Sequence, residues 1–343
     1  MIKYYKTFLN QKEKKYFFTI IFLFIILSFA EIISLSLIIP ILEIIVNGEK
    51  ESFTSKFLLA KNFELNLRSV LTLFVISILL KNIFLIFVQF INAKFIIELA
   101  NKIQFLLIKN YFDKSLIEKN KEHTSKTMRN INSEANLFSS SLVGPIMSNI
   151  SQSILILFIF FFLIVFNFKV TIIVTSLILI TGFLINFVTN KKLKKYGHQR
   201  VLLSEKFFRI LKNSFDFAKE IKILKLMDYF SNEFKKNLIL QKNIGIKRSI
   251  LGQLPKTFFE IVFALFLVTY IFFNTQTQNP NLVVEIGVYI ACIFRLMPSI
   301  NNFFMNYQKI KYSKNSYDNL KFLFEKKVSF DTHKIPTFKD KIL

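Results

Sequence analysis

The chain has 343 residues, of which 52% are hydrophobic, and its mean hydropathy is +0.44. A soluble globular domain of this length is rarely so apolar. The formal net charge is +24, and its basic residues lie between long apolar blocks, so the composition favours a membrane protein over a nucleic-acid-binding one. The single cysteine, Cys292, excludes a disulfide within the chain and a cysteine-based metal site, and the three histidines show no ligand spacing.

Six apolar segments are long enough to cross a bilayer, which takes about 20 helical residues. They lie at about residues 16–46, 69–91, 142–166, 170–188, 255–273 and 285–306. The first segment is too long for the apolar core of a cleavable signal peptide, and no small-residue cleavage motif follows it. It carries Glu31 near its middle, and Pro40 predicts a kink further on.

The segments between the spans alternate between short turns and long helices. Residues 47–68 predict either a short amphipathic helix at the membrane surface or an ordinary loop helix. The second span is expected to continue as a long amphipathic helix, because apolar residues recur at helical spacing and no Gly or Pro occurs in residues 49–143. Residues 167–169 form a very short turn, and residues 190–256 repeat the long, basic, helical pattern.

The distribution of Lys and Arg predicts the orientation in the membrane. Residues 190–256 carry seventeen basic residues and residues 94–135 carry eight, whereas residues 274–284 carry none. Both termini and both long connections are therefore expected to be cytoplasmic. Helical arms of this length would project about 30–37 Å from the membrane as two hairpins, one from spans two and three and one from spans four and five.

The basic arms lack the interleaved aromatic residues of a base-stacking surface, so nucleic acid is not expected as a partner. The anionic head groups of membrane lipids explain their charge more simply.

Three basic residues inside or beside the spans are candidates for a cationic substrate cavity: Arg295, Lys81 and Lys256. An arginine at mid-membrane costs at least ~2.5–3.5 kcal/mol on insertion scales, so Arg295 is expected to face a protein interior or a water-filled cavity. Arginine binds phosphate oxygens through its planar fork, and lysine does so as a point charge. The alternative is a structural ion pair of Arg295 or Lys81 with Glu31 or Glu260, and Lys256 could simply snorkel to the membrane surface.

Four stretches carry a family resemblance: AEIISLSLIIPIL at 30–42, AKEIKILKLMDYF at 218–230, LPKTFFE at 254–260 and FRLMPSINN at 294–302. With six spans and two long hairpins, the chain resembles the transmembrane half of an ABC exporter, in particular the PglK-type flippases for lipid-linked oligosaccharides. In those relatives a glycine often stands where Ser34 is here. The resemblance implies an all-α transmembrane domain over residues 1–327 that works as a homodimer or paired half, in the bacterial inner (plasma) membrane.

The resemblance also assigns residues. Relatives carry basic residues at the positions of Lys256 and Arg295. The tips of the hairpins hold coupling helices that sit on nucleotide-binding domains, and these would include Ser115, Leu116 and Asn120 in the first hairpin and Ala218, Lys219, Glu220 and Lys222 in the second.

The sequence departs from this family in one respect, because the family continues into an ATPase domain that binds ATP and Mg²⁺. A phosphate-binding P-loop needs G-x-x-x-x-G-K-[ST], and none of the seven glycines is followed by Lys-Ser or Lys-Thr. Residues 328–343 are expected to be a linker and the shortened start of that domain, so this chain is expected to bind no cofactor and to hydrolyse no ATP alone.

The function that follows is ATP-driven flipping or export of a lipid-linked oligosaccharide or a similar amphipathic substrate. An exporter of peptides or drugs, and a membrane scaffold without transport, are the alternatives.

Overall fold

A computed structural model describes residues 11–47, 67–113, 124–274 and 282–325. The helices are α2 (Gln11–Ser36), α3 (Ile38–Asn47), α5 (Leu67–Asp113), α7 (Thr124–Arg129), α8 (Ala135–Phe138), α9 (Gly144–Phe166), α10 (Phe168–Asp216), α11 (Ala218–Ile223), α12 (Met227–Asn274) and α13 (Leu282–Glu325), with the π-helical turns η1 (Asn130–Glu134) and η2 (Ser139–Val143) on either side of α8. These described ranges contain no strand, so the prediction of an all-α protein is confirmed.

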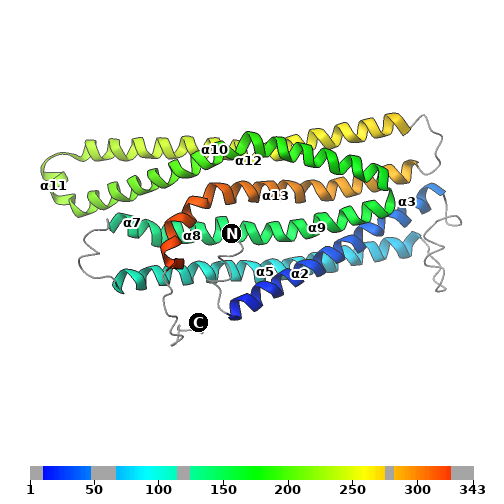
Figure 1. The fold of residues 1–343 in the computed structure, drawn as a ribbon, viewed down its shortest axis with the longest axis horizontal. Coiled ribbons are helices and arrows are strands. Elements are labelled where there is room, and N and C mark those ends of the chain that lie inside the picture. The colour runs from blue at the N-terminus through cyan, green and yellow to red at the C-terminus, as the bar shows by residue number, and fades with distance from the viewer. Residues whose placement is uncertain (1–10, 48–66, 114–123, 275–281, 326–343) are drawn as a thin grey trace.

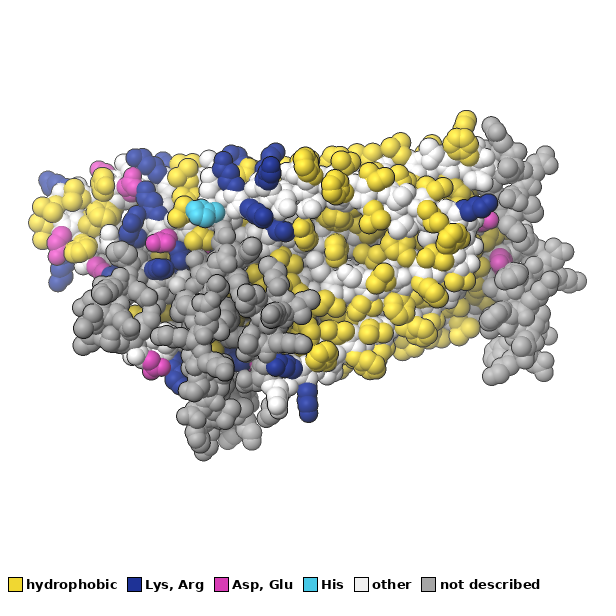
Figure 2. All heavy atoms as spheres, in the orientation of Figure 1, with side chains coloured by type: hydrophobic (Ala, Val, Ile, Leu, Met, Phe, Trp, Pro, Cys, Tyr) yellow, Lys and Arg dark blue, Asp and Glu magenta, His cyan; other side chains and the backbone are white. Residues whose placement is uncertain are grey.

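Six helices in the described part of the chain are long and apolar enough to cross a membrane. They lie along the long axis of an elongated array, with α10 and α12 at one edge, α13 and α9 in the middle, and α2 and α5 at the other edge (Figure 1). On the visible face, apolar side chains cover one half of the array, and Lys, Arg, Asp and Glu gather over the other half (Figure 2). We call these the apolar half and the arm half. This division is the one that a multi-pass membrane protein requires.

The buried apolar side chains form two clusters. One joins α9, α10, α12 and α13, where Phe259 and Leu296 are fully buried. The other joins α2, α5 and the η2–α9 segment, where Ile103 and Met147 are fully buried. Helix α13 contributes to both clusters, because Leu320 near its end belongs to the second. This helix therefore connects the two sides of the array.

The predicted length of the second span is confirmed, and the turn predicted at residues 167–169 is present but shorter than expected. Helix α5 runs unbroken from Leu67 to Asp113, so the second span does continue as one long helix. Helices α9 and α10 are separated by Asn167 alone, whose extended backbone breaks the helix and whose side-chain oxygen accepts a hydrogen bond from the backbone nitrogen of Val170. That is an N-cap, which satisfies one of the free N–H groups at the start of α10.

The first span is interrupted as predicted, but slightly before the proline. Helix α2 ends at Ser36 and α3 begins at Ile38, so the break lies at Leu37. Proline lacks an N–H and its ring crowds the carbonyl of the residue four positions earlier. For Pro40 that residue is Ser36, which explains why the disturbance appears one turn upstream.

The third span differs from a plain helix. It begins at Gly144 only after two π-helical turns, η1 and η2, each of which contains an extra residue per turn. Apolar periodicity does not reveal such turns, because a single inserted residue merely shifts the pattern that follows.

Helix α10 packs closely on α13 at Gly197. A Cβ atom at this position would overlap the carbonyl oxygen of Tyr312, so only glycine allows the two backbones to approach this far. The same packing buries Tyr312. Gly197 thus sets the position of the Tyr312 ring in the arm half.

Several predictions fall on residues outside the described ranges. These include the surface helix within residues 47–68, of which residues 48–66 are outside the described ranges, and the linker at residues 328–343.

Candidate functional site

Two basic side chains inside the apolar half meet at one carboxylate. Glu31 on α2 is 2% exposed, and its Oε1 lies 3.0 Å from Nζ of Lys81 on α5. The same oxygen lies 2.5 Å from Nε of Arg295 on α13. Three helices that are distant in sequence therefore contribute one charged residue each, and we call the group the Glu31 cluster.

Burial explains why these side chains converge. An ionised carboxylate in an apolar environment costs several kcal/mol unless it is paired, and so does an unpaired ammonium or guanidinium group. Lys81 is 13% exposed and Arg295 is 29% exposed. Each of the three charges thus loses much of its contact with solvent and gains an opposite charge within ion-pair distance.

The Glu31 cluster is not electrically balanced. Lys81 and Arg295 bring two positive charges to one carboxylate, which leaves a net charge of one. Glu31 Oε2 has no hydrogen-bond partner among the described residues, and none of them accepts a hydrogen bond from Arg295 Nε. The guanidinium group, which carries five N–H donors, therefore keeps most of its binding capacity.

The structure brings together two of the three predicted cavity residues and leaves the third apart. Lys256 lies on α12, and its Nζ is 3.8 Å from Oε1 of Glu260 one helical turn away. Both side chains are well exposed, at 61% and 44%. Of the two acids predicted as partners, Glu31 therefore pairs with both Lys81 and Arg295, and Glu260 pairs with Lys256.

The predicted coupling residues of the second hairpin occupy its far end. Ala218, Lys219, Glu220 and Lys222 are exposed on the short helix α11, which joins α10 to α12 at the end of the arm half (Figure 1). Lys225 follows with a positive φ of 54°, a left-handed conformation that turns the chain back into α12. The residues predicted for the first hairpin, Ser115, Leu116 and Asn120, lie outside the described ranges.

Sequence reasoning missed two ion pairs in the arm half that each include one almost fully buried side chain, Arg129 or Glu134. Arg129, which is 1% exposed, donates a hydrogen bond of 2.7 Å to Glu205. Arg200 donates through both terminal nitrogens to Glu134, which is fully buried at the end of η1. Each pair connects the α7–α8 region to α10. No local pattern in the sequence identifies the partner of either acid.

No group of three or more His, Cys, Asp or Glu side chains within the described residues could hold a metal ion. A scan of the sequence against models of known protein families gives no match.

Proposed function

We propose that this chain is the transmembrane part of an ATP-driven exporter of the ABC type, and that it moves an amphipathic substrate with an anionic head, such as a lipid-linked oligosaccharide. The observation that carries the proposal is the net positive charge of the Glu31 cluster. A structural ion pair needs one cation for one carboxylate, and a second, partly buried cation adds a desolvation cost without a second acid. A site that receives an anion accounts for that extra cation.

The chemistry of the three residues suggests a division of roles. Lys81 neutralises Glu31, and Arg295, the most exposed of the three, presents its planar fork to phosphate oxygens of the substrate. Glu31 competes with the substrate for Arg295. A transporter must release what it binds, so a competing carboxylate suits transport better than a site of pure positive charge.

The end of the second hairpin supports coupling to an ATPase. Large apolar side chains around α11 are exposed there, among them Phe215, Ile223 and Met227 at 75%, 77% and 69%. Exposed apolar patches of this kind mark protein interaction sites. In this proposal a nucleotide-binding domain docks on α11 and transmits ATP-driven movement through α10 and α12, and ATP and Mg²⁺ belong to that domain.

The proposal places the arm half in the cytoplasm of a bacterial cell and the apolar half in its inner membrane, with a second copy completing the pathway. The basic arms support this orientation. In a Cys292→Ala background, a cysteine at Thr277 should react with a membrane-impermeant reagent added outside, and a cysteine at Ser231 should not. Labelling of Ser231 from outside would reverse the orientation.

A membrane scaffold without transport is the second candidate. It is favoured by the direct contact of both cations with Glu31, which is also how a purely structural cluster would look.

Substitution of Arg295 separates the two candidates. The purified chain in phosphatidylcholine nanodiscs is tested for binding of a polyprenyl pyrophosphate, and the assembled transporter for ATP-dependent flipping of the same lipid. Arg295→Ala should stay folded, because Lys81 still pairs with Glu31, and should lose binding and flipping. Arg295→Lys should keep part of both, because it retains the charge but not the fork.

Lys235→Ala, which removes one exposed positive charge in the arm half, serves as the control and should behave like the wild type. The transport proposal fails if Arg295→Ala mainly lowers stability and if adding Glu31→Gln to it restores stability, lipid binding and flipping together.

A further inference from the structure

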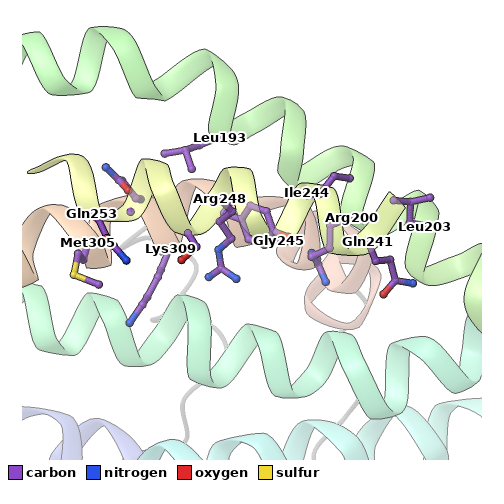
Figure 3. Close-up of a pocket in the computed structure, with 14 residues that line it drawn as sticks. Leu193, Arg200, Leu203, Gln241, Ile244, Gly245, Arg248, Gln253, Met305 and Lys309 are labelled. Atoms are coloured by element: carbon purple, nitrogen blue, oxygen red, sulfur yellow. The ribbon is translucent and has the colours of Figure 1, made fainter. Parts of the chain in front are cut away.

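A second polar region lies in the arm half, in a cavity of about 420 Å³ between α10, α12 and α13 (Figure 3). This volume falls in the range of small-molecule sites. The lining residues are Leu193, Arg200, Leu203, Gln241, Ile244, Gly245, Arg248, Ser249, Gly252, Gln253, Met305, Gln308, Lys309 and Tyr312. None of them belongs to the Glu31 cluster.

All the charged side chains that line this cavity are positive. Its lining includes three cations, Arg200, Arg248 and Lys309, and no Asp or Glu. Arg200 reaches Glu134 outside the lining. Arg248 instead lies over the ring of Tyr312, with its guanidinium carbon 4.2 Å from the ring centre. Figure 3 shows Arg248 and Lys309 extending in the same direction from their two helices.

The strongest indication of a ligand is Gln308. Its side chain is buried at 5% exposure, yet neither its amide oxygen nor its amide nitrogen has a hydrogen-bond partner among the described residues. Buried polar side chains in folded proteins almost always have a partner. Gln308 lines the cavity opposite Gly252, where a Cβ atom would lie 4.0 Å from the amide oxygen. The missing partner is therefore expected inside the cavity.

The cavity lies where the apolar half ends. Its lining residues on α10 and α12 come just after the predicted fourth span and just before the predicted fifth, and those on α13 flank the end of the sixth. At this level the phosphate groups of a bilayer and soluble phosphate esters of the adjacent water are both within reach. Apolar side chains such as Ile244 and Met305 complete the wall.

We propose that this cavity binds a phosphate group, carried either by an anionic lipid or by a soluble phosphate ester. Arg248 and Lys309 supply positive charge to the phosphate oxygens, and the Gln308 amide donates a hydrogen bond to one of them. The Tyr312 ring holds the Arg248 guanidinium in place through its face. This inference does not depend on the transport proposal, because it uses other residues.

The test uses the full chain in maltoside detergent and three probes: dihexanoyl phosphatidic acid, glycerol 3-phosphate and dihexanoyl phosphatidylcholine. Binding is measured as a saturable rise in the thermal unfolding temperature and as adducts in native mass spectrometry. Binding of phosphatidic acid alone identifies a lipid head-group site, whereas binding of glycerol 3-phosphate identifies a site for phosphate itself. Phosphatidylcholine should not bind.

Two variants locate the site. Arg248→Gln should weaken binding at least tenfold, and Gly252→Leu should do the same by filling the cavity, since nothing lies closer than 4.0 Å to a Cβ atom there. Lys242→Gln removes one positive charge from an exposed position of the same helix, outside the lining, and should bind like the wild type.

The proposal is overturned if neither phosphate probe gives saturable binding to the wild type. It is also overturned if Lys242→Gln weakens binding as much as Arg248→Gln, or if folded Gly252→Leu binds normally. Loss of binding in Arg295→Ala, with normal binding in Arg248→Gln, would assign the phosphate to the Glu31 cluster instead.

Discussion

Two groups of paired charges among the described residues differ in their ratio of cations to acids. In the apolar half, Lys81 and Arg295 share the single carboxylate of Glu31. In the arm half, Arg129 has Glu205 and Arg200 has Glu134, so each cation has an acid of its own. The arm pairs join segments that are distant in sequence and leave no net charge, whereas the Glu31 cluster leaves one.

This difference suggests a structural role for the arm pairs and a ligand-binding role for the Glu31 cluster. Each balanced pair neutralises both of its charges and fixes two segments relative to one another, which is a structural task. The Glu31 cluster keeps a positive charge that no described residue neutralises, in the apolar half, where an unpaired charge is costly. The Glu31 cluster is therefore the better candidate for binding a ligand, and the comparison can be tested by removing charges from each group.

Removing the shared carboxylate should have the largest effect. Glu31→Gln leaves Lys81 and Arg295 close together without an acid, and breaking a buried ion pair typically costs about 3–5 kcal/mol. The free energy of unfolding in detergent measures this loss. Adding Lys81→Met should recover part of the stability, because it removes one of the two unpaired cations. If Glu31→Gln is as stable as the wild type, the cluster is not the buried, coupled group described above.

Breaking one arm pair should cost less, because only one cation then loses its carboxylate instead of two. Glu134→Gln deprives Arg200 of its carboxylate, and Arg200 is 15% exposed. Hydrogen bonds to charged groups contribute about 1.5–3 kcal/mol, which is the expected loss of unfolding free energy. The exchanged pair Glu134→Arg with Arg200→Glu should be more stable than either single variant. An exchanged pair no better than the singles would contradict a direct interaction.

A change of packing in the arm half should cost about 1–3 kcal/mol, the usual effect of overfilling a close contact. Gly197→Ala introduces a Cβ atom against the Tyr312 backbone. Gly245→Ala is the matched control, because nothing lies within 4 Å of a Cβ atom there and alanine favours a helix by roughly 0.5–1 kcal/mol. Thermal unfolding of both variants measures the difference. A destabilised Gly245→Ala would show that the effect is not specific to the α10–α13 contact.

The exposed pair on α12 should have the smallest effect. Lys256→Gln removes an ion pair between two well-exposed side chains, and such pairs contribute roughly 0.2–1 kcal/mol or less. Unfolding free energy should therefore change little. Binding of a polyprenyl pyrophosphate to the same variant tests separately whether Lys256 contributes to the substrate site. Weaker binding with unchanged stability would add Lys256 to the substrate site, and unchanged binding would leave it as a surface residue.

Part of this architecture could be predicted from sequence because it is local. Apolar runs and helical spacing depend on neighbouring residues. The six spans, the unbroken α5 and the turn at Asn167 could therefore be predicted from the sequence. The same local information predicted one face of the arm helices less well. The helical pattern of residues 190–256 did not show which apolar side chains would be buried, and Leu202 and Phe215 are 55% and 75% exposed. Of the described helices, α10 and α12 extend side by side to the hairpin end (Figure 1), and two helices cannot cover each other's full apolar surface.

The pairing of charges was decided by tertiary structure alone. The sequence offered Glu31 and Glu260 as partners for Arg295 and Lys81, and nothing in the local pattern distinguishes them. The choice depends on how each helix is rotated about its axis and on which helices are neighbours. Packing of α2, α5 and α13 turns Glu31 inward, whereas α12 turns Glu260 outward beside Lys256. The extra residues of η1 and η2 likewise determine where Glu134 contacts Arg200. The spacing of apolar residues in the sequence does not reveal these π-helical turns.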